Sequence, residues 1–348
     1  MILKKISLHN FRNFSDSNFD FDKNLTIIVG DNSLGKTNLL EAIHFSVLGI
    51  GFREEKEDEL IGFNKDNSIV EGIFDFQKNN YRFLIKLKKY QDLISKNYFI
   101  NGVKKSHWSY LKEQTNIVLF SPEQVNIIIG APQLRREYFN KFISSFDYEY
   151  KKRLVNYNSA LRKRNKILEK HNNQFNLDRQ LDFWNNYLEK EGDYLTSKRS
   201  SYIDFLNNNQ HLDSKVFKVN YLKNEFNQER LKVVFEKEKL IRKTLIGPQK
   251  DDFRILINDD ILTKDVHHFG SRSEQRLAIL WLKMNELKFF DENFQKKSLL
   301  LLDDIFSELD GNNKKLIFSL ITRYQTVATT TETNMINKIK VTKKVIQL

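Results

Sequence analysis

One short stretch constrains the fold more than any other part of this 348-residue chain. The segment LTIIVGDNSLGKTNLLEAI contains the pattern G-x-x-x-x-G-K-[ST] at Gly30, Gly35, Lys36 and Thr37. Glycines at these positions let backbone N–H groups wrap a polyphosphate, while the lysine reaches the terminal phosphates and the threonine hydroxyl ligates Mg²⁺. An apolar, strand-like run precedes the loop and a helix-period run follows it, which is the context that such a loop requires. The stretch therefore predicts an α/β domain that binds a nucleotide.

Every residue of the loop is a predicted ATP contact, and Lys36 is also expected to act in catalysis. The loop residues are Gly30, Asp31, Asn32, Ser33, Leu34, Gly35, Lys36 and Thr37.

A carboxylate for the magnesium ion is expected at the end of a second buried strand. In SLLLLDDIFSELD, four leucines lead into Asp303, which is placed to hold Mg²⁺ through water, and the adjacent Asp304 is placed to orient the attacking water. Taken alone, two aspartates after an apolar run also fit an ordinary strand end. The phosphate loop in the same chain favours the metal site, with Thr37 and Asp303 as the metal residues.

The separation of these two parts indicates the domain organisation. Lys36 and Asp303 lie 267 positions apart, too far for a compact kinase or a small GTPase. Residues 1–125 and 241–348 are rich in strand patterns, whereas residues 126–240 carry mainly helix-period stripes. We therefore expect an ATPase head, with a mixed sheet and antiparallel strands, split by a mainly helical inserted domain at 126–240.

Composition narrows the class of protein further. The chain has 57 Lys+Arg against 45 Asp+Glu, a net charge of +12, which favours a polyanionic partner. It has no cysteine, which excludes disulfides and thiolate metal sites, and its seven histidines form no metal-binding pattern. No apolar run reaches the length of a membrane helix, so we expect a cytoplasmic protein with no membrane partner. The three tryptophans are expected in the core rather than as platforms for stacking bases.

The positive charge is concentrated at the start of the inserted domain. Residues 131–170 contain eleven basic and four acidic residues. A solvated helix face explains this block as well as a nucleic-acid surface does.

A polar knot, FGSRSEQR, opens a helix-period run near the end of the chain. Ser271 is expected to be the N-cap and Glu274 to complete a capping box, with Leu277, Leu280 and Trp281 packing inward. Because a helix N-terminus with free N–H groups binds phosphate, the knot is also a candidate ATP contact.

The order of these motifs resembles the ABC/SMC class of ATPases and, more narrowly, the RecF DNA-repair family. The supporting segments are LKKISLHNFRNF, VLFSPEQVNIIIGAPQLRREYFN, YNSALRKRNKIL, IGPQKDDF and LLLLDDIFSELD. They extend from residue 3 to residue 310, so the resemblance covers nearly the whole chain.

The resemblance implies a homodimer in which ATP and Mg²⁺ are sandwiched between two heads. Ser271 and Ser273 in the knot and Asp310 in the D-loop would then act in trans, across the dimer. Asp304 would be catalytic, and Arg12 is a candidate phosphate contact, although an ordinary surface arginine is an equal explanation. Ser273 stands where such a knot usually has glycine, and a threonine of ATTTET stands where transporters carry a switch histidine. These departures predict slow hydrolysis, with ATP acting chiefly to hold the dimer.

The resemblance also implies a task in recombinational DNA repair. The family recognises gapped or junction DNA at stalled or damaged replication sites and, with RecR, assists the loading of RecA. Double-stranded or gapped DNA is then the expected partner of the basic block. The candidate DNA contacts are Arg135, Arg136, Lys151, Lys152, Arg153, Arg162, Lys163 and Arg164.

Two other functions fit parts of the sequence. The ATPase subunit of a membrane transporter would need the phosphate loop and the metal aspartate closer together. The second is a short-armed SMC-like chromosome clamp, for which residues 126–240 would be unusually short arms without a hinge. A nuclease is not expected, because no second carboxylate cluster is visible.

Overall fold

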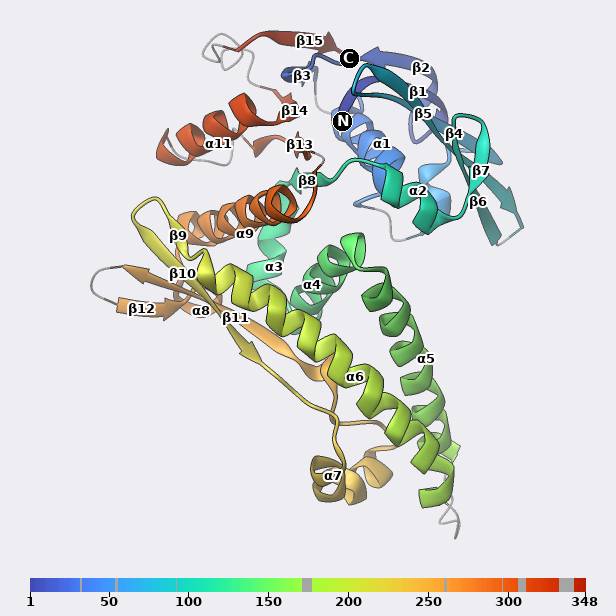
Figure 1. Ribbon diagram of the computed structural model, residues 1–348, viewed down its shortest axis with the longest axis vertical. Coiled ribbons are helices and arrows are strands. Elements are labelled where there is room, and N and C mark those ends of the chain that lie inside the picture. Colours follow the sequence, from blue (N-terminus) through green and yellow to red (C-terminus); the bar gives the residue numbers. More distant parts are fainter. Residues whose placement is uncertain are drawn as a thin grey trace. The chain divides into compact units, whose positions relative to one another are not determined.

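A computed structural model describes residues 1–31, 33–53, 56–91, 93–170, 177–259, 262–295, 297–305, 311–331 and 341–348. These residues form two compact units (Figure 1). The first unit combines residues 1–124 with 282–348, and the second comprises residues 125–281. Asn32 and Asp310, two of the predicted site residues, lie outside the described part of the chain.

The first unit contains most of the strands. They are β1 (Ile2–Phe11), β2 (Phe14–Asp20), β3 (Leu25–Val29), β4 (Asn67–Phe76), β5 (Asn79–Tyr90), β6 (Leu93–Ile100), β7 (Val103–Lys105), β8 (Ile117–Phe120), β13 (Leu299–Leu302), β14 (Gln325–Thr330) and β15 (Lys343–Gln347). Its helices are α1 (Lys36–Leu48), α2 (His107–Glu113), α11 (Gly311–Arg323) and the short 3-10 helix η1 (Glu57–Leu60). Helix α9 (Arg272–Asn293) spans the boundary with the second unit, as does the short η2 (Pro122–Val125).

These strands form two sheets of different kinds. The order β2-β1-β4-β5-β6-β7 is antiparallel throughout, whereas the order β15-β3-β14-β13-β8 is parallel throughout. Two of the three interior strands of the parallel sheet, β3 and β13, read as apolar runs, LTIIV and LLLL, because both faces of the sheet are covered. The third, β14, reads QTVATT and is equally buried. The carboxyl ends of β3 and β13 therefore meet at one edge of this sheet.

Helix α1 packs against both sheets of the first unit. Ten of its residues are buried, among them Leu39, Leu40 and Phe45 in the large core cluster. Such burial on all sides explains why the helix shows almost no amphipathic stripe. It is capped by Gly49, which has a left-handed φ of 69° and donates its N–H to the Phe45 carbonyl.

The second unit contains most of the helices and one small sheet. Its elements are α3 (Asn126–Ile129), α4 (Pro132–Phe146), α5 (Tyr148–Lys170), α6 (Leu177–Asn208), β9 (His211–Leu212), β10 (Lys215–Leu222), α7 (Gln228–Ile241), η3 (Pro248–Lys250), β11 (Asp252–Asp259), β12 (Leu262–Asp265), α8 (Val266–Phe269) and the first half of α9.

The extent of the second unit differs from the expected inserted domain. Its antiparallel sheet has the order β12-β11-β10-β9. Strand β10, before residue 240, pairs from Val216 to Leu222 with β11, after residue 240. This pairing carries the unit past the expected boundary to Trp281. The long helices α5 and α6 pack side by side, as expected for a helical insertion (Figure 1).

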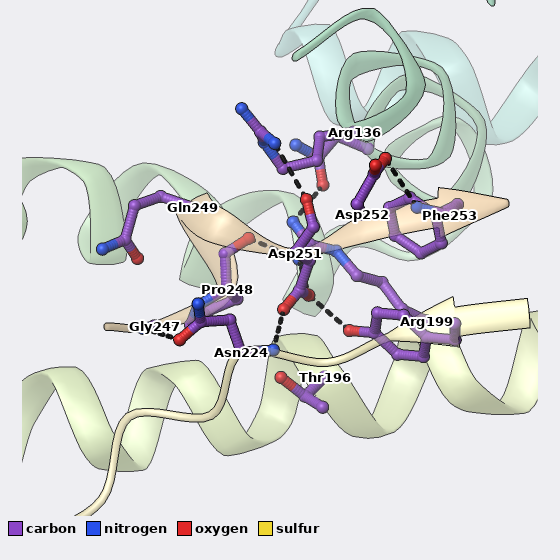
Figure 2. Close-up of polar contacts among 12 residues, drawn as sticks. Arg136, Thr196, Arg199, Asn224, Gly247, Pro248, Gln249, Asp251, Asp252 and Phe253 are labelled. Carbon is purple, nitrogen blue, oxygen red and sulfur yellow. Dashed lines mark hydrogen bonds and ion pairs between the residues drawn. The ribbon is translucent and has the colours of Figure 1, made fainter. Parts of the chain in front are cut away.

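A buried polar network joins the helices of the second unit to this sheet (Figure 2). Arg199 of α6 is 2% exposed, and it contacts the Asp251 carboxylate at 2.5 Å and the Pro248 carbonyl at 2.9 Å. Asp251 also accepts a bond from the Asn224 N–H at 2.7 Å. Gly247 has φ 119°, and a Cβ there would lie 2.3 Å from the Tyr157 hydroxyl. The segment IGPQKDDF therefore has a structural role, because its buried hydrogen bonds connect α6 to the small sheet of the second unit.

Candidate functional site

The phosphate loop lies between β3 and α1, as the sequence predicts. Gly35 has φ 105°, and a Cβ there would lie 2.6 Å from the Asn13 side chain, so this position requires glycine. The Lys36 ammonium donates to the carbonyls of Gly30 at 2.7 Å and Asp31 at 2.9 Å. These bonds curl the loop around its own lysine. The arrangement is that of a phosphate cradle, because the lysine lies where incoming phosphate oxygens would replace the two carbonyls.

Thr37 and Asp303 come together at the edge of the parallel sheet. Thr37 is the second residue of α1 and Asp303 follows β13, and the Thr37 hydroxyl donates to Asp303 Oδ1 at 3.0 Å. Thr329 of β14, the strand between β3 and β13, also donates to Asp303 Oδ1, at 2.8 Å. A hydroxyl beside a carboxylate is the oxygen donor set that suits Mg²⁺. The pair of metal residues expected from the sequence is therefore adjacent in space.

The environment of Asp303 opposes its ionisation in the free protein. Burial raises the pKa of this carboxyl, and the hydrogen bonds from Thr329 and Thr37, together with the charge of Arg53, lower it by less. The net pKa lies above the usual aspartate value. A bound cation would reverse this balance, because it favours the charged carboxylate.

Asp304 occupies an unusual backbone conformation next to the metal residues. Its φ is 46°, in the left-handed region that aspartate tolerates better than most residues. Its N–H donates to the Thr329 hydroxyl at 2.9 Å. Thr329 therefore bonds both aspartates of the pair and holds the turn after β13 against β14. Strained residues of this kind cluster at active sites.

A buried carboxylate in α1 organises two arginines near the loop. Glu41 is fully buried, and its Oε2 lies 2.8 Å from Arg12 Nε and 3.3 Å from an Arg53 guanidinium nitrogen. Burial tends to raise the pKa of Glu41, but the hydrogen bond and charge of Arg12, with those of Arg53, outweigh it and lower the pKa. Arg12, the candidate phosphate contact, is thus ion-paired in this structure. Glu41 and Arg53 are not among the site residues predicted from the sequence, although a glutamate inside the apolar run LLEAI is a signal for a buried partner.

The polar knot forms the capping box that the sequence predicts. The Ser271 N–H donates to Glu274 Oε2 at 2.7 Å, and the Glu274 N–H donates to the Ser271 hydroxyl at 3.3 Å. Lys264 also pairs with Glu274, at 2.8 Å. Leu277, Leu280 and Trp281 are buried, as expected. Ser271 and Ser273 are exposed, so the first turn of α9 lies at the surface of the second unit and faces solvent.

Two of the predicted DNA contacts are structural, and for these the expectation is corrected. Arg164 is fully buried, pairs with the equally buried Glu238 at 2.7 Å and bonds Asn185. Arg135 is 7% exposed and pairs with Asp252 at 2.8 Å. A buried charge is retained only with a partner, and these guanidiniums have theirs inside the protein. Neither presents a surface to a DNA phosphate.

The other basic candidates remain at the surface to different degrees. Lys152, Arg162 and Lys163 are exposed, whereas Lys151 and Arg153 are half-buried. Arg153 pairs with Glu149 and stacks over Tyr194. Arg136 is half-buried and donates to the Asp251 carbonyl at 2.8 Å (Figure 2). Burial, with the neighbouring Arg199, lowers the pKa of Arg136.

Two absences hold for the residues that the structure describes. These residues contain no cluster of three or more histidine or acidic side chains able to hold a metal ion. Within the same ranges, no helix has the length and apolar character needed to cross a bilayer.

Comparison with known proteins gives consistent results. The family model for the RecF/RecN/SMC N terminal domain matches residues 2–348. The DNA replication and repair protein RecF of Clostridium botulinum (strain Okra / Type B1) is 33% identical over 353 residues, covering 97% of this chain and 94% of that protein. The protein of the same description from Lachnospira eligens is 33% identical over 344 residues, covering 95% of this chain and 93% of the other.

Solved structures show the same likeness. The recombination mediator protein RecF-ATPrS in the RecFOR pathway superposes with a TM-score of 0.85 at 30% identity, covering 95% of this chain and 93% of that one. The Smc head domain derived from Pyrococcus furiosus, bound to part of ScpA, has a TM-score of 0.53 at 18% identity, covering 99% of this chain and 93% of the other. The fold class expected from the sequence is thus confirmed.

Proposed function

Because the chain belongs to the RecF family within the RecF/RecN/SMC proteins, we propose that it is an ATP-dependent DNA-binding protein of recombinational DNA repair. The observation that carries the ATP part of this proposal is the 3.0 Å contact between Thr37 and Asp303, which unites two motifs from opposite ends of the chain. Likeness to RecF proteins over 97% of the chain favours this function over a transporter subunit or a chromosome clamp.

The nucleotide would be held by the phosphate loop. In this proposal the described backbone N–H groups of residues 30–37 cradle the triphosphate, and Lys36 leaves the Gly30 and Asp31 carbonyls for the terminal phosphates. Mg²⁺ would be held by Thr37 and Asp303, and it would neutralise charge on the phosphates. Asp304, fixed through Thr329, would orient the attacking water.

A second copy of the chain would complete the site. The exposed first turn of α9, with Ser271 and Ser273, would contact the γ-phosphate held by the partner head, and Asp310 would lie at the same seam. The capping box supports this role, since it fixes the N–H groups of the turn in place. ATP would then hold the dimer, and slow hydrolysis would release it.

The DNA partner would be duplex or gapped DNA. Among the predicted contacts, those at the surface support this role, chiefly Lys152, Arg162 and Lys163, with Arg136, Lys151 and Arg153 partly accessible. Such phosphate contacts are independent of sequence and weaken steeply with salt. We further propose RecR as a partner in assisting RecA loading, a cytoplasmic location, and weak ATPase activity without nuclease activity.

Light scattering of the purified chain tests the ATP-dependent assembly. We expect a monomer without nucleotide and a dimer with a non-hydrolysable ATP analogue and gapped duplex DNA. A monomer under every condition would remove the sandwich mechanism, and rapid turnover by an isolated monomer would contradict slow hydrolysis.

Two variants separate binding of ATP from assembly. Lys36→Ala should lose the nucleotide, because the ammonium is the loop's only side-chain cation. Ser271→Arg should bind the nucleotide but fail to dimerise, because a bulky cation would fill the contact turn. The matched control is Ser201→Arg, an exposed serine on α6, which should dimerise like the unmodified chain.

A further inference from the structure

A small pocket lies between the facing ends of α5 and α6, away from the phosphate loop in sequence. Its volume is about 320 Å³, at the lower end of the range typical of ligand sites. It is lined by Lys163, Lys166, Ile167 and Lys170 of α5 and by Leu177, Gln180 and Trp184 of α6.

The floor of this pocket is part of a packed core. Leu177 belongs to a buried cluster with Leu168 and Leu181, and Ile167 packs against the same cluster. The pocket is therefore supported from below by side chains that do not move freely. A site on such a rigid base needs little ordering when a ligand binds.

One wall of the pocket is aromatic. Trp184 is half-buried, so it is not the core residue that the sequence suggested, and the Lys163 ammonium lies 4.9 Å from its ring centroid. The Trp184 ring also lies 4.9 Å from that of Phe183, which is 63% exposed, and 6.4 Å from that of Tyr187. The indole is thus held by its neighbours while it lines the pocket.

The opposite wall is strongly basic. Lys163, Lys166 and Lys170 are all exposed, and none of the described residues lining the pocket is acidic. At spacings of three and four residues they share one face of α5. They extend over about 10 Å of the helix axis, a length over which a stacked DNA strand carries roughly three phosphates.

We infer that this pocket binds single-stranded DNA, with an unpaired base stacked on Trp184 and the flanking phosphates on the three lysines. The base takes the place of the Lys163 ammonium against the indole, and Lys163 turns to a phosphate. The exposed Gln180 amide bonds the edge of the base, for which it has both a donor and an acceptor. This inference rests on the proposed DNA-binding function and extends it to the unpaired strand of a gap.

An acidic protein segment is the competing occupant, and the pocket suits it less well. Lysines alone attract either polyanion. An aromatic platform beside a cationic row, with an apolar floor between them, is the arrangement that binds single strands without sequence preference.

Fluorescence anisotropy of labelled oligothymidine of about 15 nucleotides tests the inference in the full chain. Trp184→Ala should weaken binding of this single strand by about tenfold, because one stacked base is lost. Trp184→Phe should restore most of the affinity. Replacing the three lysines with glutamine should reduce the slope of log K against log salt by about 0.7 for each lysine that contacts a phosphate.

Two controls separate this site from the fold and from the proposed function. Trp108→Ala removes another half-buried tryptophan, which has Lys112 over its ring, and should leave single-strand binding unchanged. Binding of fully paired duplex and ATP-dependent light scattering should be unaffected by Trp184→Ala. An iodouracil-substituted oligonucleotide should form a photo-crosslink to the peptide that contains Trp184.

Three results would overturn the inference. The first is equal single-strand affinity in the unmodified chain and in Trp184→Ala. The second is a crosslink that forms only to other peptides, while replacement of the three lysines weakens binding of polyglutamate, a model acidic segment, and leaves binding of DNA unchanged. The third is binding of gapped duplex but no binding of oligothymidine, which would leave the proposed function standing. If the unmodified chain bound neither DNA, both proposals would fall.

Discussion

Asp303 shows how the environment of one residue would tune the proposed metal site. Its burial makes the charged form costly, and the Thr37 and Thr329 hydroxyls recover only part of that cost. The carboxyl therefore holds a proton at a higher pH than an ordinary aspartate does. Because a metal ligand must be deprotonated, protons and Mg²⁺ would compete at this position.

Acidification should weaken Mg²⁺-dependent ATP binding, and removal of the Thr329 hydroxyl should make this loss begin at a higher pH. Thr329→Val deletes a hydrogen bond that lowers the pKa of Asp303, so this pKa should rise further. Titration of Mg²⁺ at a fixed concentration of a fluorescent ATP analogue, repeated from neutral to mildly acidic pH, measures the effect. The nucleotide's own titration is common to both proteins. Identical pH profiles would contradict this account of the aspartate.

Glu41→Gln should destabilise the first unit by about 3 kcal/mol at neutral pH, because it leaves two arginines beside a buried neutral group. The folded-state pKa of Glu41 is depressed, so its stabilisation is present above the ordinary carboxyl pKa and is lost as pH falls through the lower value. The difference in unfolding free energy between the two proteins should therefore shrink at acidic pH. Urea unfolding at neutral pH and well below pH 4.5 measures it.

The matched control for this prediction is Glu59→Gln. Glu59 lies 3.9 Å from Arg12 and its side chain is 39% exposed, so the change should cost under about 1 kcal/mol. An equal cost for the two variants would show that burial of the Glu41 charge is not what matters.

At the scale of secondary-structure elements, the start of α9 combines two requirements. The capping box needs Ser271 and Glu274, whereas close approach of a phosphate favours a residue without a side chain between them. Ser271 and Glu274 meet the first requirement, whereas Ser273, exposed on the first turn of the helix, places a side chain where the second favours glycine.

Ser273→Gly should strengthen ATP-induced dimerisation severalfold while costing about 1 kcal/mol of stability. The stability cost arises because glycine loses more backbone freedom in a helix. Light scattering against protein concentration with a non-hydrolysable analogue measures the first effect, and thermal unfolding measures the second. Weaker dimerisation than in the unmodified chain would mean that the serine side chain contributes a contact.

Helix α5 illustrates what a sequence pattern conveys about an element and what it omits. The helix-period stripes of residues 126–240 predict helices, and one of them forms at Tyr148–Lys170. The cations, however, divide between faces: Arg162 and Lys163 are exposed, whereas Arg164 is buried against Glu238. Its partner lies 74 residues away, so no local pattern distinguishes Arg164 from its neighbours.

At the scale of the whole molecule, the two units differ in how the chain builds them. The first is assembled from both ends of the sequence, since β3 pairs with β14 and β15. The second is continuous, with its sheet, its helix pair and the Arg199–Asp251 network all inside residues 125–281. A continuous unit with its own core has the means to fold alone.

A fragment of residues 125–293, which keeps α9 whole, should therefore fold without the first unit. Far-ultraviolet circular dichroism should show helix and a cooperative thermal transition, and the fragment should not bind ATP. Arg199→Met in the fragment should lower the transition temperature strongly, because Asp251 would be left buried without its cation. A fragment that melts without cooperativity would show that the second unit depends on the first.

Local patterns in the sequence determined the phosphate loop, the helix after it, the strand ending in Asp303 and the capping box at Ser271. Each depends on residues within a few positions of one another, where backbone geometry and side-chain chemistry act directly. Tertiary structure alone decided the rest: that Thr329 bonds both aspartates, that Glu41 holds two arginines, that Arg135 and Arg164 are buried, and that Trp184 borders a basic pocket. The physical reason is that burial and ion pairing depend on which distant segments pack together, and a charge or a ring has the same letter in the sequence whether it faces water or a partner.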